Sequence, residues 1–106
     1  MRYFKIILIF FLFLLNKTSF ASENIVEIMK KENNIIFIRH AIAPGNGDPQ
    51  NFDISDCSTQ RNLNKDGELQ ALKIGKFFKK NDIKFSKVLS SEWCRCKDTA
   101  LSLIHI

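Results

Sequence analysis

The sequence predicts an α/β domain, and three segments carry this prediction. Residues 34–39 contain four consecutive apolar, mostly β-branched side chains between polar neighbours, which is typical of a fully buried strand. Residues 65–81 repeat apolar side chains at helical spacing. A second short strand at 87–90 precedes a helix over 92–103. Strand, loop, helix, strand, helix is an α/β order.

The expected helices have recognisable start signals. Asn64 is a fair N-cap for the 65–81 helix, and acidic residues follow in its first turn. Ser91 is the expected cap of the 92–103 helix. A further short helix or an extended arm is expected over 23–31, while the Pro- and Gly-containing stretch 41–62 is predicted to be a loop. The face of the 65–81 helix that is expected to point inward consists of Ala71, Ile74, Gly75 and Phe78.

The first 21 residues are predicted to be a secretory signal peptide. A basic start is followed by the apolar run Ile6 to Leu15 and by a polar stretch that ends in Ala21. Spanning a bilayer takes about 20 apolar residues, so this run predicts cleavage after Ala21 and no stable membrane insertion afterwards. An uncleaved anchor is the alternative. The expected location is periplasmic or secreted.

Removing residues 1–21 changes the charge of the chain. The net charge falls from +5 to +2, because three basic residues and no acidic ones are lost. The basic character therefore belongs largely to the signal peptide, and nucleic acid is not an expected partner. Residues 22–106 are long enough for one domain with a modest core, and no linker indicates a second one.

Three cysteines, Cys57, Cys94 and Cys96, would enter an oxidising compartment, where one disulfide and one free thiol are expected. Cys94 and Cys96 point about 200° apart on a helix, so only one of them can face Cys57. A bridge from Cys57 to Cys94 would contribute roughly 4 kcal/mol. Three reduced, buried cysteines are the alternative. A thiol redox or metal site is disfavoured, because the spacing fits neither structural zinc nor C-x-x-C.

Arg39 and His40 stand at the carboxyl end of the first predicted strand, where α/β sheets bind ligands. A histidine there is a candidate nucleophile, a metal ligand or a packed core residue. The adjacent Arg39 favours the role of nucleophile, because the planar donors of arginine match phosphate oxygens. If the two strands are parallel neighbours, Arg95 arrives beside this pair, and Arg61 offers a third cation. A solvated Arg95 and an ordinary loop Arg61 are the alternatives.

Three segments in order resemble one known family. Residues 36–43 (IFIRHAIA) look like the strand and R-H-G/A signature of the histidine phosphatase superfamily, also called phosphoglycerate mutase-like. Residues 61–71 (RNLNKDGELQA) are similar to its R-x-L-x-x-x-G-x-x-Q-A segment. Residues 91–100 (SEWCRCKDTA) resemble its S-x-x-x-R-A-x-x-T-A segment. Together they cover most of residues 35–101.

The resemblance implies a phosphoglycerate mutase-like sandwich with a mostly parallel central sheet flanked by helices. It also implies a phosphatase that hydrolyses small phosphate monoesters without a metal or cofactor. His40 would be the nucleophile that forms a phosphohistidine, and Arg39 and Arg95 would clamp the phosphoryl oxygens. Arg61 would be a third member of this clamp.

The sequence departs from the family pattern at several positions. Ala41 replaces the commoner glycine, and Cys96 occupies a small alanine position, which favours Cys94 as the partner of Cys57. The family also needs a second histidine later in the chain. Only His105 follows His40, and it lies about 15 Å along the helix from Arg95, too far to share one phosphate.

We therefore expect the chain to be the N-terminal portion of such a domain, ending after the second strand and helix. The alternative function is a non-catalytic secreted module that binds phosphate or another anion, or an inactive fragment.

Overall fold

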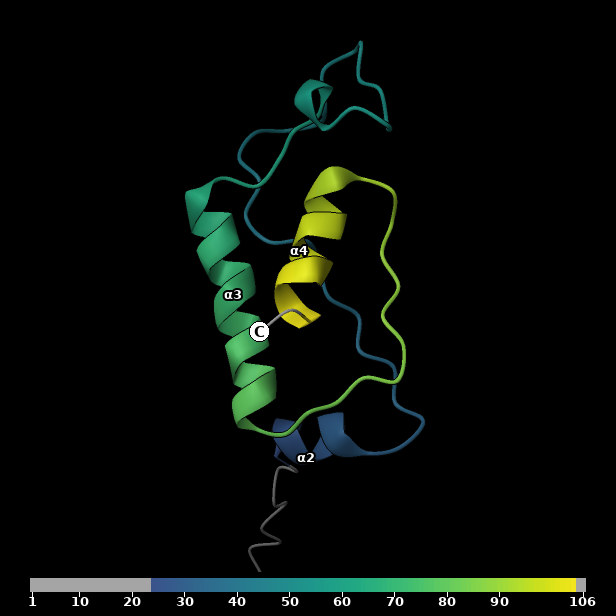
Figure 1. Ribbon diagram of the computed structural model, residues 1–106, viewed down its shortest axis with the longest axis vertical. Coiled ribbons are helices and arrows are strands. Elements are labelled where there is room, and N and C mark those ends of the chain that lie inside the picture. The colour runs from purple at the N-terminus through teal and green to yellow at the C-terminus, as the bar shows by residue number, and fades with distance from the viewer. Residues whose placement is uncertain (1–23, 105–106) are drawn as a thin grey trace, which may run out of the picture.

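The computed structural model describes residues 24–104. Its helical elements are α2 (Ile25–Lys30), the 3₁₀ helix η1 (Cys57–Thr59), α3 (Lys65–Lys80) and α4 (Cys94–Ile104). Helices α3 and α4 pack against each other, with the loop 44–62 beyond one end and α2 at the other (Figure 1). The predicted signal peptide, its cleavage site and His105 lie outside the described residues. No helix between residues 24 and 104 is both long and apolar enough to cross a membrane.

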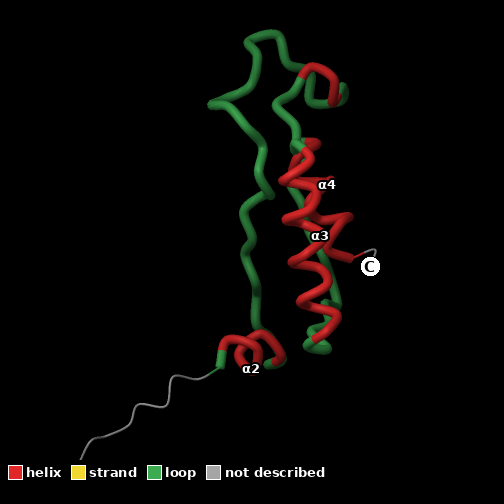
Figure 2. The backbone as a smooth tube through the Cα atoms, turned by 90° about the vertical axis from the view of Figure 1, so that its left-hand side faces the viewer, coloured by secondary structure: helices red, strands yellow, loops and turns green. Residues whose placement is uncertain are grey.

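The predicted α/β sandwich is wrong for this structure, because residues 24–104 contain helices and no strand. Residues 35–40 and 87–91 run as extended chain without pairing (Figure 2). They line opposite sides of one hollow, with Ile36 and Ile38 on one side and Val88 and Leu89 on the other. A buried strand needs a hydrogen-bonded neighbour and cover on both faces. Here Phe37 is 91% exposed, so the apolar run gave the extended shape but not the burial.

Helix α3 confirms the helix predicted over 65–81 and ends one residue earlier. The Asn64 side chain accepts a hydrogen bond from the Gly67 N–H at 2.9 Å, as an N-cap should. The buried residues of this helix are Gly67, Ala71, Gly75 and Phe78. Their spacing of four, four and three residues puts them on one face, which gives the helix its apolar side.

The C-terminus of α3 is a Schellman motif. Asp82 adopts a left-handed φ of 55°, and its N–H donates to the Lys79 carbonyl at 3.1 Å. The N–H of Ile83 donates to the carbonyl of Phe78 at 2.9 Å. Ile83 and Phe78 are both buried, which supplies the hydrophobic contact that accompanies this motif. Phe78 also meets Phe85 edge to face, with ring centroids 5.0 Å apart.

Helix α4 matches the predicted last helix, but its start differs from the prediction. It begins at Cys94, so Ser91 is not its cap. The N–H of Cys94 instead donates to Oε1 of Gln60 at 3.0 Å, across 34 residues of sequence. A side chain from the loop therefore satisfies one of the free N–H groups at the start of this helix.

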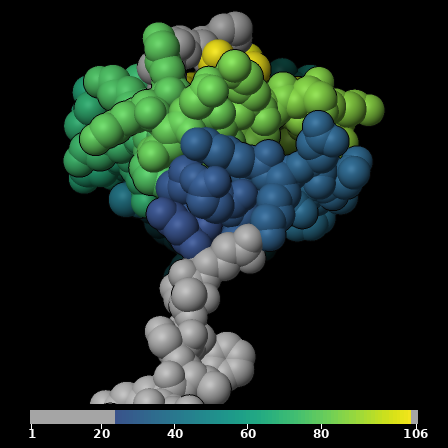
Figure 3. Space-filling view, turned by 90° about the horizontal axis from the view of Figure 1, so that it is seen from below, coloured from purple at the N-terminus to yellow at the C-terminus, as the bar shows by residue number. Residues whose placement is uncertain are grey.

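The short helix α2 agrees with the helix expected over 23–31. The Asn24 side chain accepts from the Val26 N–H at 3.0 Å, which caps this helix. Seen from below, α2 and the chain that follows it lie beside residues from the end of α3 onward (Figure 3). Residues 29–37 and residues 84–89 line a common groove there.

The loop 44–62 is ordered by its own side chains and is attached to α4. Within the loop, Gln60 Nε2 donates to the carbonyls of Asp53 and Ile54. A disulfide joins Cys57 to Cys94, the first residue of α4, with a Cα–Cα distance of 5.7 Å. Cys96 carries the free thiol. This is the pairing that the family resemblance at Cys96 favours.

Residues 41–43, called the 41–43 segment below, are held by both long helices. The Ala41 N–H donates to Thr99 Oγ1 on α4 at 3.0 Å, and the Ile42 N–H donates to Gln70 Oε1 on α3 at 2.9 Å. The Ile42 carbonyl accepts from the Asn64 N–H at 3.3 Å. Ala41 and Ala43 are buried. This segment therefore passes between the helices in a fixed register.

Gly67 permits the close approach of this segment to α3. A Cβ atom at position 67 would lie 2.0 Å from the Ile42 carbonyl oxygen and 3.0 Å from its carbonyl carbon. Both are main-chain atoms of Ile42, and the oxygen already accepts a hydrogen bond from the Asn64 N–H, so this carbonyl group has little freedom to move away. The absence of a side chain at Gly67 is thus a packing requirement.

We expect Gly67→Ala to destabilise the protein by about 1–3 kcal/mol, the usual cost of overpacking. Alanine in a helix interior would gain at most about 1 kcal/mol over glycine, which is too little to offset the clash. Thermal unfolding measures the change. Lys76→Ala, at an exposed position of the same helix, is the matched control and should leave the melting temperature almost unchanged. A Gly67→Ala protein as stable as wild type would contradict the close approach.

The disulfide predicts one reactive thiol in the unfolded, unreduced protein, because only Cys96 is free. Alkylation followed by mass measurement counts it, and three modified thiols would rule the bridge out. Removing the bridge with Cys57→Ser should lower the free energy of unfolding by up to roughly 4 kcal/mol. Cys96→Ser is the control, with no reactive thiol and near wild-type stability.

Candidate functional site

His40 directly precedes the 41–43 segment and is partly buried. Its Nδ1 lies 2.7 Å from the carbonyl oxygen of Ala41. A carbonyl oxygen only accepts hydrogen bonds, so Nδ1 must carry the proton in this contact. In the neutral imidazole, Nε2 then keeps its lone pair. The local backbone thus sets both the orientation and the tautomer of the ring.

Thr99 connects this histidine to Arg95 on α4. Its hydroxyl donates to the Arg95 carbonyl at 2.7 Å and accepts from the Ala41 N–H at 3.0 Å. Thr99 is buried, so both hydrogen bonds are shielded from water. One side chain therefore fixes the residue after His40 relative to the turn of α4 that carries Arg95.

Arg95 is buried, with 8% of its surface exposed, so the alternative of a solvated arginine is wrong. Its Nη1 donates to Asp48 Oδ1 at 2.9 Å and to the Arg61 carbonyl at 3.3 Å. The guanidinium carbon lies 4.5 Å from the centre of the Trp93 ring, a cation–π contact. Its Nε is buried and has no hydrogen-bond partner in the described part of the chain.

Arg61 reaches the same place from the loop. Its main-chain N–H donates to Asp48 Oδ1 at 2.9 Å, and its side-chain Nη1 donates to the carbonyls of Ala43 and Gly45. As in Arg95, Nε is buried and finds no partner within residues 24–104. The structure therefore brings Arg61 and Arg95 together around one carboxylate.

Asp48 forms a nearly buried ion pair with Arg95, in which each side chain is 10% exposed. Burial acts to raise the pKa of Asp48, but the hydrogen bond from the Arg61 N–H, the hydrogen bond from Arg95 and the charges of both arginines outweigh it. The pKa of Asp48 is consequently below its ordinary value. The carboxyl is ionised at neutral pH, and its charge offsets part of the positive charge of the two guanidinium groups.

Arg39 is placed differently from the other two arginines. Its side chain is exposed, and it takes no part in the hydrogen-bonded group of Arg61, Asp48 and Arg95. Of the four predicted site residues, the structure joins Arg61 to Arg95 directly. His40 is linked to Arg95 through Ala41 and Thr99.

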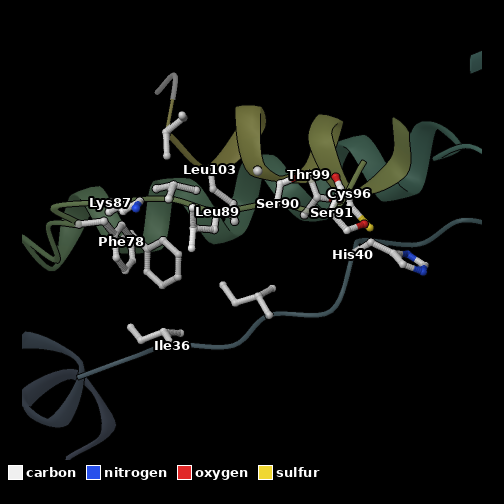
Figure 4. A pocket seen from close by; sticks show the side chains of 15 residues that line it. Ile36, His40, Phe78, Lys87, Leu89, Ser90, Ser91, Cys96, Thr99 and Leu103 are labelled. Carbon is white, nitrogen blue, oxygen red and sulfur yellow. Dashed lines mark hydrogen bonds between the residues drawn. The ribbon is translucent and has the colours of Figure 1, made fainter. Parts of the chain in front are cut away.

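A hollow of about 260 Å³ lies beside His40, between the two extended segments and α4. Figure 4 shows His40 at one end of it, near Cys96 and Thr99, with the ring directed away from Ile36 and Leu89. Its lining is largely apolar and includes none of the three arginines. The hollow is therefore distinct from the arginine pair. Within the described residues, no group of three acidic, His or Cys side chains is placed to hold a metal ion.

Four residues at this site have no role in the sequence prediction: Asp48, Gln60, Gln70 and Thr99. Gln70 and Thr99 lie inside the motif segments, and their fixed spacing was the available signal. The structure shows that both accept backbone N–H groups of the 41–43 segment. Asp48 and Gln60 lie in a polar loop, where nothing in the pattern distinguishes them from their neighbours.

Comparison with known proteins places the chain in a family. The model of the family described as "Histidine phosphatase superfamily (branch 1)" matches residues 35–105, which is more than half of the 106 residues. No curated protein and no solved structure matches the chain. The match spans His40, the arginine pair and the residues that fix the 41–43 segment. The chain belongs to the histidine phosphatase superfamily, branch 1.

Proposed function

We propose that the protein is a phosphatase that hydrolyses phosphate monoesters through a phosphohistidine on His40. The observation that carries this proposal is the hydrogen bond from His40 Nδ1 to the Ala41 carbonyl, 2.7 Å long. It keeps the Nε2 lone pair free for attack on phosphorus. It also keeps the ring fixed, so that little orientational freedom is lost on reaction.

The reaction has two displacements. In the first, Nε2 forms a bond to phosphorus as the bond from phosphorus to the ester oxygen breaks, and the leaving oxygen takes a proton from solvent water to depart as the alcohol. In the second, water attacks the phosphohistidine, its oxygen bonds to phosphorus, and the P–N bond breaks. A proton of that water is released, and inorganic phosphate departs. His40 returns to its neutral state.

The arginines supply the charge that this reaction needs. The phosphoryl transition state is loose and spreads negative charge over its equatorial oxygens, so preorganised cations stabilise it. Arg95 is held by Asp48 and by the face of Trp93, and Arg61 is held by two backbone carbonyls. Arg39, which lies in the first extended segment directly before His40, would complete the clamp when a phosphate ester binds.

We further propose that the protein works in the periplasm or outside the cell. Two features support this location. The first residues have the order of a signal peptide, and the Cys57–Cys94 disulfide suits an oxidising compartment. The substrate class we propose is a small phosphorylated molecule.

A non-catalytic anion-binding module remains the second candidate. It is favoured by the fact that Arg61, Asp48 and Arg95 are assembled without any contact from the imidazole of His40. The two functions differ in what they require of His40, since only the phosphatase needs its ring.

We expect His40→Ala to lose at least about 10³-fold in the rate of hydrolysis of an aryl phosphate, because the nucleophile is removed. Mixing the wild-type protein with substrate and trapping it under denaturing alkaline conditions should reveal an acid-labile phosphate on His40. His105→Ala is the matched control and should keep the wild-type rate. Hydrolysis that persists in His40→Ala would refute the proposed mechanism. Phosphate binding without any hydrolysis in the wild type would select the second candidate.

Arg95→Ala should lower kcat/KM by on the order of 10²–10³, by analogy with removing one donor to a developing oxyanion. Arg95→Lys should restore only part of it, since lysine keeps the charge but not the planar fork. Steady-state kinetics on the same aryl phosphate measures both. Lys97→Ala, at an exposed position of α4, is the control. A loss below about tenfold for Arg95→Ala would remove Arg95 from the clamp.

A further inference from the structure

We propose that Asp48 is a positioning residue for the phosphate clamp: its carboxylate sets which edge of Arg95 is presented to the substrate and ties Arg61 to it. This inference rests on the proposed function. Asp48 lies in none of the three motif segments, and its role is deduced from the contacts of its carboxylate.

The first step in the argument is that one oxygen of Asp48 serves both arginines. Oδ1 accepts from Arg95 Nη1 and from the Arg61 N–H, each at 2.9 Å. Arg95 Nη1 also donates to the Arg61 carbonyl, at 3.3 Å. The three residues therefore form a closed arrangement, in which the Asp48 oxygen bridges Arg61 and Arg95.

The second step concerns the edge of Arg95 that is left over. A guanidinium offers two parallel donors along its Nε–Nη2 edge, which is the edge that does not include Nη1. Asp48 engages Nη1, and the Trp93 ring lies against the guanidinium group. Asp48 fixes Nη1 and Trp93 fixes one face of the guanidinium, so the plane of the group is set. The Nε–Nη2 edge is then available to another oxyanion.

The third step is that the leftover donors lack partners. Nε of Arg95 and Nε of Arg61 are both buried without a hydrogen bond in the described residues. A buried donor without an acceptor is costly, and such groups are rare in folded proteins. An oxygen of a phosphate ester is an acceptor that would satisfy them after a small local opening.

Two other roles for Asp48 fit the geometry less well. A general acid must hold a proton at working pH, but the arginines lower the pKa of this carboxyl. If Asp48 were a competitor that occupies the place of phosphate, its carboxylate would have to move away from Arg95 when phosphate binds. Asp48 accepts hydrogen bonds from both the Arg61 main chain and the Arg95 side chain. Moving its carboxylate away would therefore break two charge-stabilised hydrogen bonds.

These roles predict opposite signs for one variant. If Asp48 only competes with phosphate, removing its negative charge strengthens the binding of an anion. If Asp48 positions the arginines, removing its oxygens weakens the binding of phosphate, because the fork is no longer held. Asp48→Ala therefore separates the two ideas.

The experiment uses the protein without its signal peptide and inorganic phosphate as the probe, with binding measured by calorimetry and turnover measured on an aryl phosphate. For Asp48→Ala we expect phosphate affinity and kcat/KM to fall by on the order of tenfold to a hundredfold. Asp48→Asn retains an oxygen at the same position and should bind phosphate within a few-fold of wild type. Asp48→Glu keeps the charge but shifts it by one methylene, and it should lose affinity.

The controls separate positioning from folding. Asp53→Ala removes a carboxylate from the same loop without touching either arginine and should leave phosphate binding unchanged. Thermal unfolding should show Asp48→Asn destabilised, since Arg95 loses its counterion, while its phosphate affinity is retained. A purely structural role would instead lower stability and leave the affinity of the folded protein intact in every variant.

Three results would overturn the inference. The first is phosphate binding by Asp48→Ala that is as tight as in wild type or tighter. The second is an equal loss in the Ala and Asn variants, which would indicate collapse of the loop. The third result applies if Asp48→Ala does not fold: it is phosphate binding by Asp48→Glu that is as tight as in the wild type. A wild-type protein that neither binds nor hydrolyses phosphate would refute the proposed function itself, and this inference with it.

Discussion

The backbone of the 41–43 segment is the constraint on which the rest of the structure depends. Its N–H and carbonyl groups are bound by Thr99 on α4, by Gln70 on α3 and by the residue that caps α3. These contacts replace the hydrogen bonds that a sheet would provide at this place. The two helices are thereby aligned on one short stretch of chain, and the orientation of His40 follows from that stretch rather than from its own packing.

The start of α4 gathers the second group of contacts. Four contacts join the loop 44–62 to this end of the helix: the disulfide, the Gln60 hydrogen bond, the Asp48 ion pair and the tilted contact between the Phe52 and Trp93 rings. They differ in chemistry: one is covalent, one is a hydrogen bond, one is an ion pair and one is a contact between aromatic rings. The loop is long, but its own short-range contacts and these four contacts with α4 together hold it in place. It can therefore fix the positions of Arg61 and Arg95.

The sequence predicted the helices well and the sheet badly, for physical reasons. Helix α3 has a local period, a cap at Asn64 and an apolar face, and all of these signals lie within the helix itself. A strand instead depends on a partner, and the run around Phe37 finds none in the described chain. The same distinction applies to the site. The spacing of motif residues predicts His40, Arg61 and Arg95 as site residues, whereas the contacts of Asp48 and Gln60 arise only when distant segments meet.

Gly67 gives a guide to how this sequence can vary. Glycine in a helix usually suggests flexibility or a tolerated defect, yet here it marks the crossing point of two backbones. Exposed positions of α3 can vary through many residue types at little cost, while any side chain at position 67 costs stability. Among diverged relatives, a glycine retained at this point of the helix would therefore report that the chain next to the histidine still follows the same path, even where little other similarity survives.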